Sequence, residues 1–242
     1  MNEQIFRGNE INHLEAWKRE AYHLFQEKLK NKVDLFPCIP AVQGNYLGHL
    51  RFSFLDDVKS HSAGKDLADN LKEYNTISKE TGQYASLIIF SNNSEKLSVQ
   101  AYEDLFWSLL SNVSLYDEES WPANIPIEPE NQNWEYCFQK EPYFVYCATP
   151  SHKKRKSRYF PFFMLALTPR WVLEQFEKNN KKAKNTKASI RNRLTRYDRI
   201  PPHPELKTYG DDGNLEWKQY FLRDDETSLP QCPFKKLLNF RK

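Results

Sequence analysis

Tyr84-Ala85-Ser86-Leu87-Ile88-Ile89-Phe90 is the stretch that decides the fold, an apolar run that ends at the polar residues 91–94. A short apolar run bounded by turn-forming residues is typical of a strand in the interior of a sheet. The preceding segment, Ala63 to Glu80, has the pattern of a helix, and Gly82 suits the cap that ends such a helix. The sequence therefore predicts a sheet on which helices pack.

Outward from this strand, the same patterns predict further helices and strands. The helices are expected at 12–31, at 99–113, from Pro169 onward and at 188–197, and the strands at 50–54, 143–148 and 160–168. Non-helical segments are expected around Pro37 and Pro40, in a loop at 121–133 and in a lysine-rich break at 178–187. This order favours an α+β fold with a mostly antiparallel sheet flanked by helices. We expect one domain over residues 1–242, with 200–242 as an extended segment that wraps around it.

The composition excludes several classes of protein. Of the 242 residues, 14% are aromatic and only 7 are glycine, which favours an ordered interior over a disordered chain. No apolar run reaches the ~18 residues of a membrane-spanning helix, and the N-terminus lacks the apolar segment of a signal peptide. The four cysteines form no Cys-x-x-Cys pair, which argues against a zinc site and a disulfide framework. We expect a cytoplasmic protein without a membrane partner.

The positive charge is clustered although the net charge is only +3. Basic residues gather in two runs, at 153–158 and at 178–199. Such runs can bind nucleic acid, but they can equally be solvated faces or contacts for an anionic substrate. Because no nucleic-acid-binding module is recognisable, we keep a nucleic-acid-binding protein only as an alternative.

Three side chains have the chemistry of a metal or cofactor ligand. His49 stands at the mouth of the strand 50–54, and His152 stands beside the first basic run. A neutral imidazole in either place can ligate a metal or a haem iron. Cys38 could supply a thiolate. Each has a structural alternative: a histidine satisfied within its own loop or by the backbone, or a small buried thiol.

Arginines and one short segment complete the candidates. The forked hydrogen bonds of an arginine suit carboxylates, and the arginines concerned are Arg51, Arg155 and Arg158. The segment 216–220 combines an acid, an amide and a phenol, namely Glu216, Gln219 and Tyr220. An acid in a pocket would suit recognition of a guanidinium or an amine. A surface strand or turn is the alternative interpretation of this segment.

Several short motifs together resemble the YqcI/YcgG family. The match runs from about residue 15 to residue 234, and the order and spacing of the pieces are specific although no single piece is. The pieces are Phe-Pro-Cys at 36–38 with Ala41, Leu-Arg-Phe at 50–52, Thr-Pro-Ser-His-Lys-Lys-Arg-Lys-Ser-Arg at 149–158, Thr-Pro-Arg-Trp at 168–171, Ile-Arg at 190–191, Tyr-Asp at 197–198, His-Pro at 203–204, Glu-Trp-Lys-Gln-Tyr at 216–220 and Cys-Pro-Phe at 232–234.

This resemblance implies a bacterial haem protein. Relatives of the guanitoxin and arginine-hydroxylating type are haem-dependent enzymes that N-hydroxylate a guanidine or an amine. The resemblance therefore implies haem b, a small guanidino or amino substrate and an external electron donor. A haem-binding or haem-sensing protein without turnover is the first alternative, and a homodimer is left open.

The resemblance also implies a role for each candidate residue. The iron ligand would be His49 or His152, with Cys38 as the fallback. The cofactor would be held by arginines, namely Arg51, Arg155 and Arg158. The substrate would lie near Glu216, Gln219 and Tyr220.

Overall fold

Five strands form one sheet in the order β1-β2-β5-β4-β3, in a computed structural model that describes residues 4–92, 95–208 and 212–236. The strands are β1 (Leu50–Leu55), β2 (Ser86–Ser91), β3 (Tyr136–Phe138), β4 (Glu141–Ala148) and β5 (Phe163–Pro169). Only β1 and β2 are parallel, and the other three pairings are antiparallel. The mostly antiparallel sheet with helices around it confirms the predicted α+β class.

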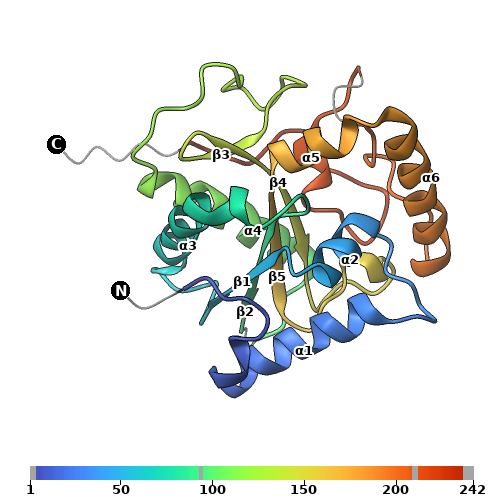
Figure 1. The fold of residues 1–242 in the computed structure, drawn as a ribbon. Coiled ribbons are helices and arrows are strands. Elements are labelled where there is room, and N and C mark those ends of the chain that lie inside the picture. Colours follow the sequence, from blue (N-terminus) through green and yellow to red (C-terminus); the bar gives the residue numbers. More distant parts are fainter. Residues whose placement is uncertain (1–3, 93–94, 209–211, 237–242) are drawn as a thin grey trace.

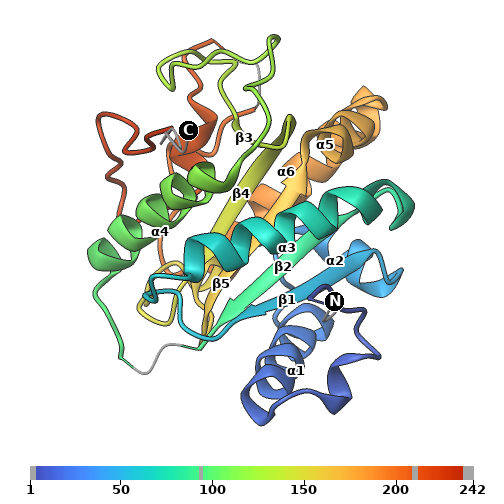
Figure 2. The same cartoon turned by 90° about the vertical axis from the view of Figure 1, so that its left-hand side faces the viewer.

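Helices cover both faces of the sheet (Figures 1 and 2). The α-helices are α1 (Ala16–Lys30), α2 (Ile39–Tyr46), α3 (Ala63–Ile77), α4 (Val99–Val113), α5 (Arg170–Glu177) and α6 (Asn180–Tyr197). Short 3-10 helices span Ile11–His13, Ser78–Glu80, Ser114–Tyr116, Lys156–Arg158 and Glu216–Gln219. The helices α3 and α4 pack on one face, whereas α1 packs on the other, which also carries α2. The sheet is therefore the middle one of three layers.

The central strand β2 shows why both faces need a cover. All six of its residues are buried, and they alternate between two apolar cores. Leu87 and Ile89 belong to the core under α3 and α4, whereas Ile88 and Phe90 belong to the core under α1. In the second core the rings of Phe25 and Phe90 lie 5.7 Å apart. The apolar run 84–90 thus contains an interior strand, as predicted.

Two helices depart from the sequence prediction. The helix before Pro37 ends at Lys30 as expected, but α2 was not predicted: Pro40 stands in its first turn, where its missing N–H is not needed. The break predicted at 178–187 is wrong, because α6 runs through it. The Asn179 side chain caps this helix by accepting the N–H of Lys182 at 3.0 Å, and lysine and alanine are good helix formers. The three-residue strand β3 was also not predicted.

The chain after α6 has little regular structure but packs closely on the body of the protein (orange to red in Figures 1 and 2). Its aromatic side chains enter the core under α3 and α4, namely Trp217, Tyr220, Phe221 and Phe234. Of the segment 200–242, residues 209–211 and 237–242 lie outside the described part. No helix within the described ranges is long and apolar enough to cross a membrane.

Candidate functional site

The segment 214–225 brings most of the predicted site residues together. It runs beside β4 beyond the end of β3, where the Cys147 N–H donates to the Tyr220 carbonyl at 3.1 Å. The loop 149–158 reaches the same segment through side-chain hydrogen bonds. Six of the predicted residues therefore lie around it: His152, Arg155, Arg158, Glu216, Gln219 and Tyr220.

Glu216 belongs to a buried ion cluster with Glu135 and Arg170. The Arg170 guanidinium donates to Glu135 at 2.5 Å and also to Glu216, and all three side chains are at most 6% exposed. Burial raises the pKa of Glu216 to about 7, although the charge of Arg170 opposes the rise. Burial lowers the pKa of Arg170, but the two carboxylates outweigh it and the pKa is raised. Glu216 is therefore balanced between its charged and neutral forms near neutral pH.

The carboxylate of Glu216 already recognises a guanidinium, that of Arg170 in its own chain. A substrate guanidinium would have to replace this internal partner, so a substrate contact of Glu216 stays a prediction. The Tyr220 hydroxyl lies 3.4 Å from the Glu216 carboxylate and donates to the Tyr143 carbonyl at 3.0 Å. Sequence reasoning missed Glu135 and Arg170, although Arg170 lies within the family motif 168–171.

Arg155 gives its guanidinium donors to backbone carbonyls. It reaches the carbonyls of Pro201, Arg223 and Asp225 at 2.8–3.0 Å, and it is only 1% exposed. These bonds would have to be shared or exchanged before this guanidinium could hold a cofactor carboxylate. In this structure Arg155 fastens the C-terminal segment to the loop 149–158.

Arg158 has a similar environment. Its guanidinium lies 4.3 Å from the ring centre of Tyr146 and donates to the carbonyls of Gln219 at 2.8 Å and Tyr220 at 2.9 Å. The side chain of Gln219 donates in turn to Asn214 at 3.1 Å. Arg158 and Gln219 therefore hold the turn at 216–220 in place, and their predicted cofactor and substrate contacts stay predictions.

The basic run 153–158 is not a continuous charged surface. Its two arginines are buried, and the backbone N–H groups of Lys153, Lys154 and Arg155 all donate to the Asp224 carboxylate at 2.7–3.0 Å. Lys156 forms an ion pair with Asp34. This part of the chain is thus a poor candidate for the nucleic-acid alternative.

His152 is buried and hydrogen-bonded through both ring nitrogens. Its Nε2 lies 2.8 Å from the Leu222 carbonyl, and its Nδ1 lies 2.9 Å from the Thr149 hydroxyl. Since a carbonyl only accepts, Nε2 carries the proton and Nδ1 accepts. Burial lowers the pKa of His152 to about 4. An iron would have to displace one of these two partners.

His49 lies away from this cluster, in what we call the His49 corner (Tyr46, Leu47, His49, Arg51 and Tyr84). Its ring stacks on that of Tyr84 with centres 6.1 Å apart, and its Nδ1 is buried without a hydrogen-bond partner. Burial and the nearby Arg51 lower the pKa of His49, which keeps the imidazole neutral. Tyr46 and Leu47 expose 84% and 46% of their surface. The corner combines a neutral imidazole, a cation and exposed apolar surface.

Gly82 makes room for the His49 ring. A Cβ atom at this position would lie 2.5 Å from the ring atoms, and the φ angle of Gly82 is +117°. Both the space and the backbone angle therefore require glycine. The residue predicted as a helix cap in fact lies five residues beyond the end of α3 and two beyond the 3-10 helix Ser78–Glu80.

Cys38 lies at the start of α2, near enough to Arg158 for the charge of that guanidinium to act on its thiol. Burial raises the pKa of its thiol, and the backbone N–H of Ala41 opposes the rise only in part. The side chain is therefore a thiol at neutral pH, and its role as the fallback iron ligand stays a prediction. Across the described residues, no group of three His, Cys, Asp or Glu side chains is arranged to hold a metal ion.

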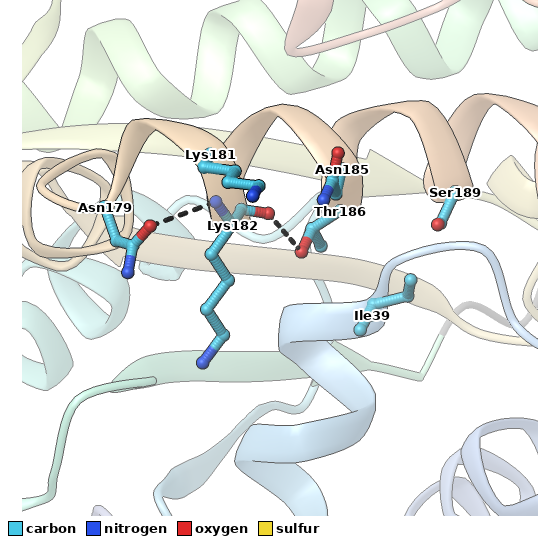
Figure 3. A pocket seen from close by; sticks show the side chains of 7 residues that line it. All are labelled: Ile39, Asn179, Lys181, Lys182, Asn185, Thr186 and Ser189. Carbon is cyan, nitrogen blue, oxygen red and sulfur yellow. Dashed lines mark hydrogen bonds between the residues drawn. The ribbon is translucent and has the colours of Figure 1, made fainter.

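A groove of about 430 Å³ separates the start of α2 from α6 (Figure 3). It is lined by Ile39, Asn179, Lys181, Lys182, Asn185, Thr186 and Ser189. None of the predicted site residues lines it. Neither α2 nor the first half of α6 is predicted from the sequence, so sequence reasoning offered no route to this groove.

Comparison with known proteins agrees with the resemblance in the sequence motifs. Residues 25–235 match the profile of the YqcI/YcgG family. The chain is 47% identical over 233 residues to the uncharacterized protein YqcI of Bacillus subtilis (strain 168), with 95% of this chain and 92% of YqcI covered. It is 46% identical over 230 residues to the uncharacterized protein YcgG of the same strain, with 93% and 91% covered.

A more distant relative has a name that states an activity. It is a Streptomyces lavendulae protein called "Putative N(omega)-hydroxy-L-arginine synthase DcsA", 28% identical over 244 residues, with 96% of this chain and 87% of DcsA covered. No solved structure matches the chain. With its profile match over most of the sequence and two relatives above 45% identity, the chain belongs to the YqcI/YcgG family.

Proposed function

We propose that this protein is a haem-dependent oxygenase that N-hydroxylates a small guanidino or amino compound. The similarity to DcsA over nearly the whole chain supports the reaction class. In such a reaction a substrate N–H becomes N–OH. One atom of dioxygen enters the product and the other leaves as water, which requires two electrons from an external donor and two protons. Bound haem would supply the activation of dioxygen.

The His49 corner carries this proposal. Haem b has an apolar ring, an iron that accepts a nitrogen ligand and two carboxylates. Among the described histidines, only His49 has a buried ring nitrogen without a hydrogen-bond partner. His152 uses both nitrogens, and so does His203, which contacts the Thr227 carbonyl and the Glu205 N–H. We therefore assign the iron to His49 rather than to His152.

Side chains near His49 suit the other parts of the haem, namely its apolar ring and its carboxylates. Tyr46 and Leu47 expose apolar surface beside His49, and burying such surface against a haem ring is favourable. The Arg51 guanidinium lies close enough to lower the pKa of His49 and can hold a carboxylate. It now donates to the carbonyls of Gly48 and Leu50, both at 3.0 Å, from Nη1.

Absorption spectra of protein produced with a haem precursor test this assignment. The wild type is expected to show a Soret band and about one haem per chain in a pyridine haemochrome assay. His49→Ala should lose the haem and keep its circular dichroism spectrum. His23→Ala is the matched control, because His23 is exposed on α1 and should leave haem occupancy unchanged.

The outcomes separate the parts of the proposal. Full haem occupancy in His49→Ala would remove His49 as ligand, and a wild type that stays colourless with added hemin would end the haem proposal. Oxygen uptake that depends on a guanidino compound such as L-arginine separates an enzyme from a haem sensor. A haem protein without uptake for any guanidino or amino compound would support the sensor instead.

A further inference from the structure

The helix α6 is the most strongly charged element of the fold. Its 18 residues include seven lysines and arginines and no acidic residue. At 1.5 Å per residue the helix extends over about 27 Å. Because the whole chain has a net charge of only +3, the rest of the protein is net negative. The positive potential is therefore concentrated along one helix.

Most of this charge faces solvent. Only Ala183 and Tyr197 of α6 are buried, and the half-buried Ile190 and Leu194 continue the same inner stripe. The opposite face carries exposed basic side chains, namely Lys181, Lys184, Arg191 and Arg196. Within the described part of the chain, Lys187 with Glu177 is the one ion pair recorded for this helix. Apart from Lys187, the cationic side chains of α6 thus have no acidic partner among the residues that the structure describes.

The loop before α2 adds apolar surface next to this helix. Arg193 donates to the Phe36 carbonyl at 3.2 Å and so joins the loop to the C-terminal half of α6. In that loop Val33 is 97% exposed and Leu35 is 47% exposed. Across the groove in Figure 3, α6 also faces Ile39 of α2, the helix that leads to the His49 corner. The basic face, the apolar loop and α2 therefore adjoin one another.

We propose that α6 is the docking surface for an acidic electron-donor protein, an inference that rests on the proposed function. N-hydroxylation needs two electrons per turnover, and a protein that carries one or two electrons on a flavin or an iron–sulfur cluster would deliver them. Complementary charges steer such encounters and raise their association rates. The exposed side chains of Val33 and Leu35 supply apolar contact surface, which the basic face of α6 lacks.

A protein partner explains these features better than nucleic acid does. The other basic run, at 153–158, has its arginines buried and so adds little phosphate-binding surface to that of α6. Exposed apolar side chains such as Val33 have no role against a phosphate backbone. Nucleic acid is therefore treated as a competing outcome of the test.

The test measures binding to an acidic flavodoxin by isothermal titration calorimetry. The charge-reversal variant is Lys184→Glu with Arg196→Glu, since both side chains are exposed and neither makes a hydrogen bond or an ion pair with a described residue. The matched control is Lys79→Glu with Lys96→Glu, which makes the same charge change at exposed positions outside α6. The α6 variant should bind at least about tenfold more weakly at low salt, and the control should bind as the wild type does. Raising the ionic strength should weaken wild-type binding.

Each result decides something. Equal losses in both variants would show an effect of net charge alone and would overturn the assignment to α6, as would unchanged binding in both. Duplex DNA that binds the wild type more tightly than flavodoxin, and loses affinity only in the α6 variant, would replace the donor by nucleic acid. Because binding is measured without turnover, a colourless protein that still docks flavodoxin through α6 would end the haem proposal but keep α6 as the docking surface.

Discussion

Replacing Glu216 by Gln should change how the stability of the protein depends on pH. In the folded state burial raises the pKa of Glu216 to about 7, whereas an unfolded glutamate titrates at 4.5. Between these two values the folded state binds more protons than the unfolded state. The free energy of unfolding therefore falls as the pH rises through this window, and it is level above it. Glutamine has the shape of the neutral acid and does not titrate.

The size of the effect follows from the pKa difference. At 1.36 kcal/mol per pKa unit, the shift corresponds to about 3 kcal/mol, most of which falls between pH 5 and pH 8. Over that range Glu216→Gln should gain roughly 2–3 kcal/mol of stability relative to the wild type. Titrations of groups outside the cluster of Glu216, Glu135 and Arg170 are common to both proteins and cancel in the difference.

Urea unfolding followed by tryptophan fluorescence at pH 5, 6, 7 and 8 measures this difference. Glu20→Gln, at an exposed position on α1, is the control and should follow the wild type throughout. The reasoning is refuted if the difference between Glu216→Gln and the wild type stays constant within about 0.5 kcal/mol. That result would mean that the pair with Arg170 offsets the burial of the carboxylate entirely.

Two further substitutions test the anchoring of the loops. Arg155→Met leaves three partly buried carbonyls without their charged donor and should cost about 2–3 kcal/mol, or roughly 6 °C in melting temperature. Lys154→Met is its exposed control, and a loss below about 1 kcal/mol for Arg155→Met would contradict the anchoring role. Gly82→Ala should cost about 1–3 kcal/mol through its φ angle and its clash with the His49 ring, and should also lower haem occupancy. Gly213 also has a positive φ angle, but a Cβ atom there would meet no other atom. If thermal melting shows that Gly213→Ala costs as much stability as Gly82→Ala, the clash with the His49 ring contributes nothing.

Much of the fold could be predicted because local patterns and tertiary packing agree. The predicted helix at 99–113 coincides with α4, whose apolar face is continuous and whose first turn is capped by Ser98. The prediction failed at 178–187 because a run of lysines is also typical of a solvated loop. The cap at Asn179 is a single side-chain contact, which no periodicity in the sequence reveals. A pattern of apolar residues cannot mark a helix that buries only two side chains.

The candidate site was predicted as a set of residues but not as a set of contacts. Six of the chosen side chains do gather around 214–225, because charged groups in aromatic-rich segments must find partners when those segments are buried. The partners themselves come from distant parts of the chain. Arg170 opposite Glu216 and the Leu222 carbonyl opposite His152 are separated by 46 and 70 residues from the groups they contact. No single-sequence pattern reports such distances.

The hydrogen bonds between the loop 149–158 and the C-terminal segment also set an order for biosynthesis. His152 and the backbone N–H of Arg155 find their partners 70 and 69 residues later in the chain. At about 5–20 residues per second, a ribosome needs roughly 4–14 s to supply them. During that interval the guanidinium of Arg155 lacks the carbonyls of Pro201, Arg223 and Asp225 that accept its hydrogen bonds in the folded protein. The nascent protein should therefore stay open at this part of β4 until residues 219–225 emerge, and a chaperone would bind it there.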